Sequence, residues 1–239
     1  MKIVKLEEWQ QSDNRSISDH AYDKLVSKIL RMELPPGAPM VEKNLIDELQ
    51  IGRTPIREAL HRLAGEGLVC REPHRGVFIC EATPEYVRDI CEFRMSIEGR
   101  IANLAAANQS EQHVEKLDGI AQRLEALDPV DDFDDIIKLG RQYYLIMAEA
   151  VGNVHYMEMV PRLYNVGLWF LFYAGKIKGD WPELCNEFRA VLGDLVAPIS
   201  KHQADQAEAV MRLYVTNYRV ALDNHLDALW HDPKVEKPL

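Results

Sequence analysis

The 239-residue sequence lacks any run of about eighteen apolar residues, the length that a membrane-spanning helix requires. Its first ten residues, MKIVKLEEWQ, have no long apolar segment after the lysines, so the pattern of a signal peptide is missing too. We therefore expect a chain that has no membrane partner and remains in the cytoplasm.

Cysteine is scarce in this sequence. The four residues, Cys70, Cys80, Cys91 and Cys185, show no CxxC or comparable spacing of the kind found in redox and zinc motifs. The simplest interpretation is that all four are reduced thiols in a cytoplasm, where structural disulfides are rare.

Recognisable catalytic groupings are missing as well. The sequence has no suitably placed pair of carboxylates, no Ser/His/Asp or Cys/His grouping and no glycine-rich phosphate loop. We therefore do not expect an enzyme. Hydrophobic residues nevertheless make up 47 % of the chain, enough for the core of one large or two ordinary domains.

Positive charge is in short supply. The net charge is −10, which by itself argues against nucleic acid as a partner. The distribution of the charges removes this objection, because residues 15–82 contain ten Lys/Arg and ten Asp/Glu. The cations of this neutral part are clustered, and the acidic surplus lies in residues 83–239, where it would repel wrongly placed phosphates.

The stretch Val41–Glu81 has the pattern of a DNA-reading unit. Three apolar residues give one face to a short helix: Leu45, Ile46 and Leu49. Ile51 and Gly52 then break the helix, as the turn of a helix-turn-helix does. A second helix follows, and it has a buried stripe of four residues: Ile56, Ala59, Leu60 and Leu63.

The second helix is expected to start at Thr54-Pro55, because Thr caps free N–H groups and Pro is tolerated in the first turn. Gly65 and Gly67 predict its end. Its other face carries polar side chains close to the end at which a recognition helix meets bases and phosphates. These side chains are Arg53, Thr54, Arg57 and His61.

Two short β-type runs follow the second helix, at 68–70 and 77–79. The turn between them exposes Arg75 beside Gly76, which suits a wing whose tip approaches the minor groove closely. A single arginine on a helix or in a turn is usually solvated surface. The order and spacing of all these parts favour the functional interpretation.

The segments PPGAPM, LIDELQIGRTPIREALHRLAGEGLV and RGVF resemble the N-terminal domain of the GntR family of bacterial repressors, over about residues 18–82. The resemblance implies base contacts from Arg53 and Arg57, phosphate or sugar contacts from Lys43 and Thr54, and a wing contact from Arg75 with Gly76. Gly52 departs from the family pattern, since many relatives have a small hydroxyl residue there, and one phosphate contact would be lost.

Beyond residue 82 the sequence is helical throughout. Thr83-Pro84-Glu85 is a helix start and marks a domain boundary. We expect an antiparallel bundle of six helices near 84–108, 110–127, 132–151, 154–176, 181–202 and 204–231. The predicted fold is therefore mainly α, with a flexible segment at 1–17, a winged helix-turn-helix domain at 18–82 and an all-helical domain at 83–239.

Two segments of this helical part, CEFRMSIEG at 91–99 and YYLIMAEAVGN at 143–153, resemble the FadR subfamily, whose C-terminal FCD domain is an all-helical effector sensor. Relatives in that subfamily often hold a divalent metal with one Asp and three His. The resemblance puts these ligands at Gly140, Tyr144, Phe188 and Tyr214, and none of the four binds metal in that way.

The remaining histidines of the helical part do not replace this metal set. They are scattered over positions that look exposed or terminal: His113, His155, His202 and His225. We therefore expect no metal and no other cofactor.

A large, mostly apolar interior takes the place of the metal set. Gly140 opens space, and buried Tyr hydroxyls need partners, so both favour a cavity, although an aromatic stripe is as often plain core. The candidate effector-binding residues are Arg94, Gly140, Tyr144, Asn165, Trp169, Phe188, Tyr214 and Tyr218.

Arg94 stands in an apolar stripe between Ile90 and Ile97, where an unpaired guanidinium would be costly. It could clamp the carboxylate of an effector, since Arg pairs carboxylates bidentately and the matching Arg of the family has that role. An internal salt bridge to Glu98, one turn on, and a place at a dimer seam are the alternatives.

The function that these features predict is a DNA-binding transcription regulator. We expect a homodimer that represses from an inverted-repeat operator, with its recognition helices about 34 Å apart, and that a small, mainly apolar or aromatic organic acid releases. An activator or an acyl-type effector sensor of the same fold stays open, as do a helical-bundle enzyme and a protein-interaction module without DNA binding. The expected location is the bacterial cytoplasm, at the nucleoid.

Overall fold

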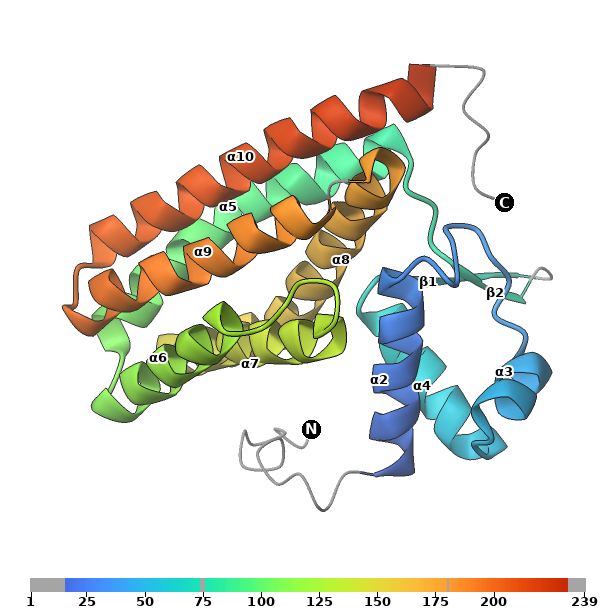
Figure 1. Cartoon of the computed structure of the whole chain (residues 1–239). Coiled ribbons are helices and arrows are strands. Elements are labelled where there is room, and N and C mark those ends of the chain that lie inside the picture. Colours follow the sequence, from blue (N-terminus) through green and yellow to red (C-terminus); the bar gives the residue numbers. More distant parts are fainter. Residues whose placement is uncertain (1–15, 74–75, 180, 232–239) are drawn as a thin grey trace. The chain divides into compact units, whose positions relative to one another are not determined.

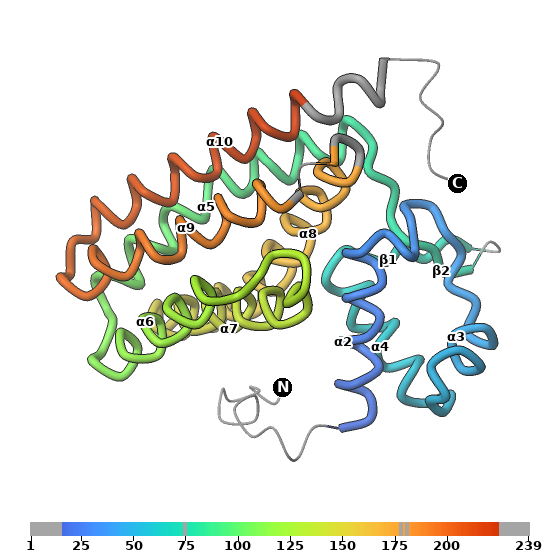
Figure 2. Tube along the Cα trace, in the orientation of Figure 1, coloured from blue at the N-terminus to red at the C-terminus, as the bar shows by residue number. Residues whose placement is uncertain are grey.

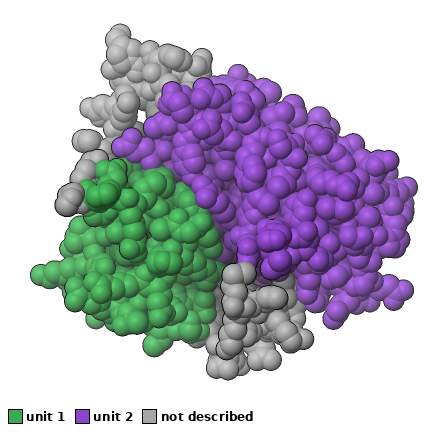
Figure 3. Space-filling model, turned by 180° about the vertical axis from the view of Figure 1, so that it is seen from behind, with its two compact units in different colours: residues 1–80 green, residues 81–239 purple. Residues whose placement is uncertain are grey.

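The computed structural model describes residues 16–73, 76–179 and 181–231. The chain forms two compact units, Met1–Cys80 and Glu81–Leu239 (Figure 3). The described residues form nine helices, α2 to α10, and one two-stranded sheet (Figure 1). The predicted fold class, mainly helical with a small hairpin before an all-helical part, is confirmed.

The first unit begins with a well-capped helix. Its elements are α2 (Ile17–Leu30), α3 (Glu42–Leu49), α4 (Arg53–Gly65), β1 (Val69–Glu72) and β2 (Gly76–Ile79). Ser16 and Asp19 close a capping box at the start of α2, each side chain accepting from the other residue's N–H. The buried face of α2 packs against α4, whose buried stripe is the predicted one: Ile56, Ala59, Leu60 and Leu63.

The turn between α3 and α4 is tight, because Gln50 adopts the left-handed conformation with φ of 55°. The prediction that α4 starts at Thr54 and is capped by its hydroxyl is wrong. Gly52 occupies the cap position and has no side chain to offer, so the helix begins at Arg53. Thr54 consequently lies inside the first turn.

The wing is an antiparallel hairpin in which Glu72 pairs with Gly76. Gly76 has φ of 101°, a conformation that other residues rarely adopt, which explains a glycine at this end of the turn. A bridge between Pro39 and Phe78 fixes the hairpin to the segment that precedes α3. Arg75, the predicted residue of the wing tip, lies outside the described residues.

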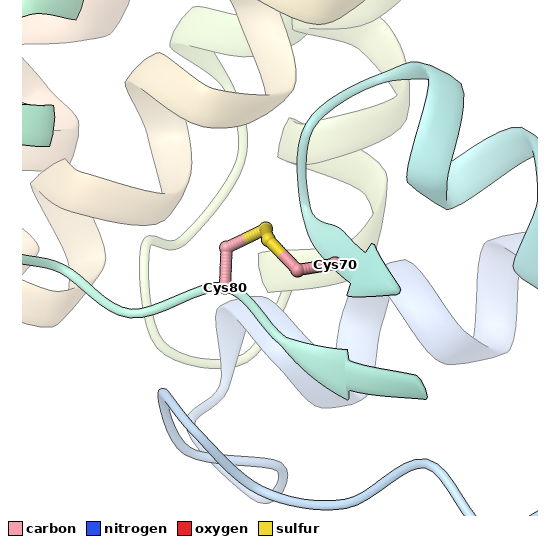
Figure 4. The surroundings of a disulfide bond; sticks show 2 residues. All are labelled: Cys70 and Cys80. Atoms are coloured by element: carbon pink, nitrogen blue, oxygen red, sulfur yellow. A yellow bond between two sulfur atoms is a disulfide. The ribbon is translucent and has the colours of Figure 1, made fainter. Parts of the chain in front are cut away.

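The prediction of four reduced thiols is wrong at the base of this hairpin. Cys70 of β1 and Cys80, which follows β2, form a disulfide with 5.2 Å between their Cα atoms (Figure 4). Strand pairing brings the two residues within bonding distance, and the sequence spacing alone does not reveal this. Cys91 and Cys185 are free and buried.

The second unit contains six helices: α5 (Pro84–Asn108), α6 (Glu111–Glu125), α7 (Phe133–Val151), α8 (Val154–Lys178), α9 (Trp181–Ser200) and α10 (Ala204–His231). The predicted segments agree with these bounds to within two residues at every end. Thr83 caps α5 by accepting from the Tyr86 N–H, and Pro84 opens the helix, as expected from the sequence.

Helix α8 runs through the core of this unit. Every residue from 163 to 175 is buried, so this stretch of the helix is covered on all sides. Helices α5 and α10 lie side by side along the unit, with α9 next to α10 (Figure 2). Buried tyrosines find carbonyl partners here, since the Tyr143 hydroxyl donates to the Leu192 oxygen at 2.7 Å.

Candidate functional site

The solvent face of α4 carries the two arginines that the sequence singles out. Arg53 and Arg57 stand one turn apart, and their side chains are 69 % and 58 % exposed. The other predicted contact residues of this unit that the structure describes are exposed as well: Lys43, Thr54, His61 and Gly76. All of them are therefore accessible to a large partner.

Glu42 is a member of this surface that the sequence analysis did not identify. Arg57 Nε donates to both carboxylate oxygens of Glu42 at 2.9 Å, and Arg53 Nε reaches one of them at 3.4 Å. The Arg57 guanidinium holds the pKa of Glu42 below its usual value. Exposed pairs of this kind contribute about 0–1 kcal/mol, so a competing acceptor group can replace the carboxylate at low cost.

A second charged group lies in the interior of the helical unit. Arg94 and Glu98 are 3 % and 1 % exposed and face each other one turn apart on α5. Arg94 donates to Glu98 through Nε at 2.5 Å and through Nη2 at 3.2 Å. Burial works against the cation, but the Glu98 carboxylate outweighs it and raises the pKa of Arg94. This is the internal salt bridge that the sequence left open.

The Arg94 guanidinium lies close to both α8 and α10. It lies 4.0 Å from the ring centroid of Tyr218, whose hydroxyl donates to the Gly167 carbonyl at 2.8 Å. A Cβ atom at Gly167 would lie 2.8 Å from Arg94 Nη1, so a larger residue there would have to displace the guanidinium. Nη1 has no hydrogen-bond partner among the described residues, and such a buried donor costs about 1–3 kcal/mol.

Tyr214 completes this group on α10. It is half-buried, and its ring centroid lies 6.3 Å from that of Tyr218. Burial raises the pKa of Tyr214 to about 12, although the nearby Arg94 opposes the shift. The structure thus brings three of the predicted effector residues together: Arg94, Tyr214 and Tyr218.

The expectation that Gly140 opens space is corrected by the structure. A Cβ atom there would lie 2.6 Å from the Tyr164 hydroxyl oxygen and 2.7 Å from Cζ of Phe188, so these two rings already fill the volume. The Tyr144 ring packs on Tyr164 with 5.2 Å between centroids. Around Gly140, the aromatic stripe is therefore packed core.

Asn165 and Trp169 are fully buried on α8. Each stands two positions from Gly167, which in an α-helix is nearly the opposite side from the face that meets Arg94. Trp169 stacks on Phe170, and its Nε1 has no hydrogen-bond partner among the described residues. The predicted effector residues therefore do not all face one point.

A groove of about 480 Å³ lies between α6 and α9, away from all predicted residues. Its walls include Asp118, Glu125 and Asp194, which would repel an anion. Its one lining cation, Arg189, already donates to carbonyls at the end of α6. The groove does not suit an organic acid.

Two histidines of the second unit have structural roles. His113 closes the capping box of α6 with Ser110, and His202 lies against the Ala106 carbonyl at 3.0 Å. His155 is exposed, and the side chain of His225 is outside the described part. Within the described residues, no three His, Cys, Asp or Glu side chains are placed to hold a metal ion.

Comparison with known proteins identifies both units. Residues 17–79 match the model of the "Bacterial regulatory proteins, gntR family", and residues 89–217 match the FCD domain. A Streptomyces ambofaciens HTH-type transcriptional regulator from an unstable DNA locus is 38 % identical over 227 residues, which cover 93 % of this chain and 87 % of that protein. The chain belongs to the GntR family of bacterial regulatory proteins.

Other relatives are more distant. The HTH-type transcriptional regulator McbR and the repressor RspR, both of Escherichia coli, are 27 % and 25 % identical over 59 % of this chain. These matches span 65 % and 62 % of the two relatives, less than two thirds of their length. The solved structure of E. coli McbR/YncC has a TM-score of 0.68 at 20 % identity, covers 88 % of this chain and 99 % of its own, and supports the fold.

Family membership makes this GntR protein a DNA-binding transcription regulator and not an enzyme, as the sequence predicted. The small hairpin after α4 is accordingly the wing of a winged helix-turn-helix. Among the helices of the described residues, none has the length and apolar character needed to cross a membrane.

Replacing Glu42 by Gln should raise the affinity for random-sequence DNA by about two- to fivefold, because two arginines lose their competing anion. Fluorescence anisotropy with a labelled duplex at fixed salt measures the change. Asp47→Asn is the control, since it removes the same charge from an exposed position of the same helix. An equal rise in both variants would mean that net charge alone is responsible.

Gly140→Ala should lower the free energy of unfolding by about 1–3 kcal/mol, because the added methyl group meets Tyr164 and Phe188. Urea unfolding followed by circular dichroism measures it. Gly119→Ala is the matched control: nothing lies within 4 Å of its Cβ position on α6. That variant should gain about 0.5–1 kcal/mol from helix propensity. A neutral effect at Gly140 would refute the packing described for its surroundings.

Proposed function

We propose that this regulator is a repressor that binds an inverted-repeat operator as a homodimer and leaves it when a small, mainly apolar or aromatic organic acid binds to the FCD domain. Within the GntR family, the FCD domain favours the FadR subfamily. The observation that carries the proposal is the pair of exposed arginines on the first two turns of α4. The relative RspR, itself described as a repressor, supports the direction of regulation.

In this proposal each side chain of the DNA surface has a distinct role. Arg53 and Arg57 pair with base edges in the major groove, where the guanidinium fork matches guanine. Lys43, Thr54 and His61 contact phosphates or sugars and so fix the position of α4. Gly76, with its φ of 101°, lets the wing backbone approach the minor groove beside Arg75.

The dimer follows from the geometry of DNA. One α4 reads only a few base pairs, so two copies about one helical turn apart, near 34 Å, are needed for a specific site. A symmetric dimer then requires an inverted repeat. DNA-binding transcription regulators act on the chromosome, so we expect this protein at the nucleoid in the bacterial cytoplasm.

The effector is proposed to bind beside Arg94. Its Nη1 is buried and without a partner among the described residues, so an acceptor atom of a ligand would remove a standing cost. The rings of Tyr214 and Tyr218 give this position an apolar wall. The other candidate residues, Tyr144 and Phe188 near Gly140 and Asn165 and Trp169 on α8, would contribute by moving when the ligand enters.

The charge of the ligand matters at this position, because Glu98 already neutralises Arg94. An acid must share the guanidinium with Glu98 or displace it, whereas a neutral acceptor needs only Nη1. We propose the acid, since Arg binds carboxylates bidentately. The ligand then breaks a contact of α5, and it loosens DNA only by as much as it prefers the DNA-free arrangement.

The DNA arm of the proposal is tested by selecting duplexes from a random library with the full-length protein. An inverted repeat with half-sites about 10 base pairs apart is expected. Arg53→Ala and Arg57→Ala should each weaken operator binding by about tenfold or more, since a good bidentate pair is worth about 1–3 kcal/mol. Sequence-selective binding that survives both substitutions would refute the role of α4.

The effector arm compares acids with their amides, such as benzoate with benzamide, in thermal-shift and operator-release assays. Arg94→Ala alone would strand Glu98 at a cost of about 3–5 kcal/mol, so the test uses Arg94→Met with Glu98→Met, which removes both charges. This double variant should still bind the operator but lose release by acids. Release that persists unchanged excludes Arg94 as the ligand's partner.

Metal independence is a further expectation, because the four family ligand positions hold Gly140, Tyr144, Phe188 and Tyr214. Dialysis against a chelator should leave the melting temperature and the effector response unchanged. Elemental analysis of the purified protein provides the direct measurement. One equivalent of tightly held zinc or nickel would overturn this expectation.

A further inference from the structure

The base of the wing carries the only disulfide formed by the four cysteines of the chain. Cys70 is exposed on β1, and Cys80 is buried directly after β2 (Figure 4). Cys80 is also the last residue of the first unit, and α5 starts at Pro84. The bond thus closes a ring around the wing and ties the start of the interdomain segment to β1.

We propose that Cys70 and Cys80 form a reversible thiol–disulfide pair, and that its oxidised form binds the operator more tightly than its reduced form. The inference rests on the proposed function in one respect, namely that the wing contacts DNA. It adds a second input to the regulator: a chemical oxidant such as a peroxide, besides the small-molecule effector.

The reducing environment around bacterial DNA argues that the Cys70–Cys80 disulfide forms reversibly. A regulator that reads a bacterial chromosome works where thiol reductants are abundant, and disulfides in that compartment are mostly transient or redox-sensing. The exposed position of Cys70 gives reductants and oxidants access to the pair. The two free cysteines, Cys91 and Cys185, do not compete for the oxidant, because burial raises the pKa of their thiols to about 11.

Oxidation by hydrogen peroxide balances without a further reactant. The Cys70 thiolate attacks one peroxide oxygen, the O–O bond breaks, and a sulfenic acid and hydroxide form. The Cys80 thiol then attacks the Cys70 sulfur, the S–S bond forms, and water leaves. Two thiols and one peroxide thus give one disulfide and two waters, and two electrons pass from sulfur to oxygen.

Reduction needs a dithiol of the thioredoxin or dithiothreitol class. Its thiolate attacks the Cys70 sulfur, and Cys80 leaves as a thiolate that takes up a proton. The second thiol of the reductant then resolves the mixed disulfide and releases Cys70 as a thiol. The reductant ends as a disulfide, and the protein pair gains two electrons and two protons.

The hairpin itself does not depend on the bond. The Ile79 N–H donates to the Ala38 carbonyl at 2.9 Å, and the Cys80 N–H donates to the Leu68 carbonyl at 3.0 Å. Neither bond involves a sulfur atom, so we expect both in either redox state. The disulfide adds a covalent restraint on the hairpin ends, so the oxidised wing loses less freedom when DNA orders it and binds more tightly.

The test compares one protein in two redox states. Full-length protein is treated with either hydrogen peroxide or dithiothreitol, and mass spectrometry after alkylation assigns the state of each cysteine. Anisotropy then gives operator affinity at equal salt. The expected result is a Cys70–Cys80 disulfide after peroxide, its loss with dithiothreitol, and operator affinity weaker by about fivefold or more in the reduced form.

Two variants assign the effect. Cys70→Ser should bind like the reduced wild type and ignore peroxide, whereas Cys185→Ala, which removes a buried thiol elsewhere, should keep the full response. Circular dichroism checks the fold of both, and the reduced wild type is a control without substitution. Absence of a Cys70–Cys80 bond after peroxide overturns the inference, and so does equal or tighter operator binding by the reduced form.

The outcomes separate this inference from the proposed function. If both redox forms bind the operator equally and Arg53→Ala abolishes binding in each, only the redox coupling is refuted. If neither form binds any selected duplex, the proposed function fails and the redox inference falls with it.

Discussion

The packing of the helical unit has to accommodate a buried ion pair. Arg94 and Glu98 stand within the apolar face of α5, where a single unpaired charge would cost several kcal/mol. Each charge offsets the cost of burying the other, and side chains of the neighbouring helices pack around the pair. Gly167 leaves room for the guanidinium, and Tyr218 covers its face. The proposed ligand, by disturbing this pair, would therefore disturb contacts on three helices.

The exposed and the buried ion pair differ in how easily a competing group can replace one of the two partners. The pairing of Glu42 with Arg57 is exposed and weak, so a competing acceptor group can replace the carboxylate readily. The pairing of Arg94 with Glu98 is screened from water and persists unless a competing group enters the interior. Exposed pairs suit a surface that must release and rebind its partner, and a buried pair suits a contact that responds to one ligand.

Most of the architecture could be predicted from the sequence, since caps, prolines and apolar periodicity are local signals. The capped start of α5 at Thr83 is one example. The contacts that depend on how elements meet could not be predicted. Glu42 and Arg57 are 15 positions apart and Cys70 and Cys80 are 10 apart, and each pair joins two different segments of the chain, so local periodicity does not reveal the contact. The filling of the space at Gly140 likewise depends on side chains from other helices.

In the proposed complex, the Glu42 carboxylate that pairs with Arg53 and Arg57 affects how DNA binding depends on ionic strength. Each phosphate neutralised by a protein cation releases counterions from the DNA, and this release normally makes affinity fall steeply with salt. In the proposed complex, the base edges that pair with Arg53 and Arg57 also release Glu42, which then binds a cation from solution and offsets part of that counterion release. The proposed complex should therefore tolerate changes in ionic strength better than the number of its phosphate contacts alone would suggest.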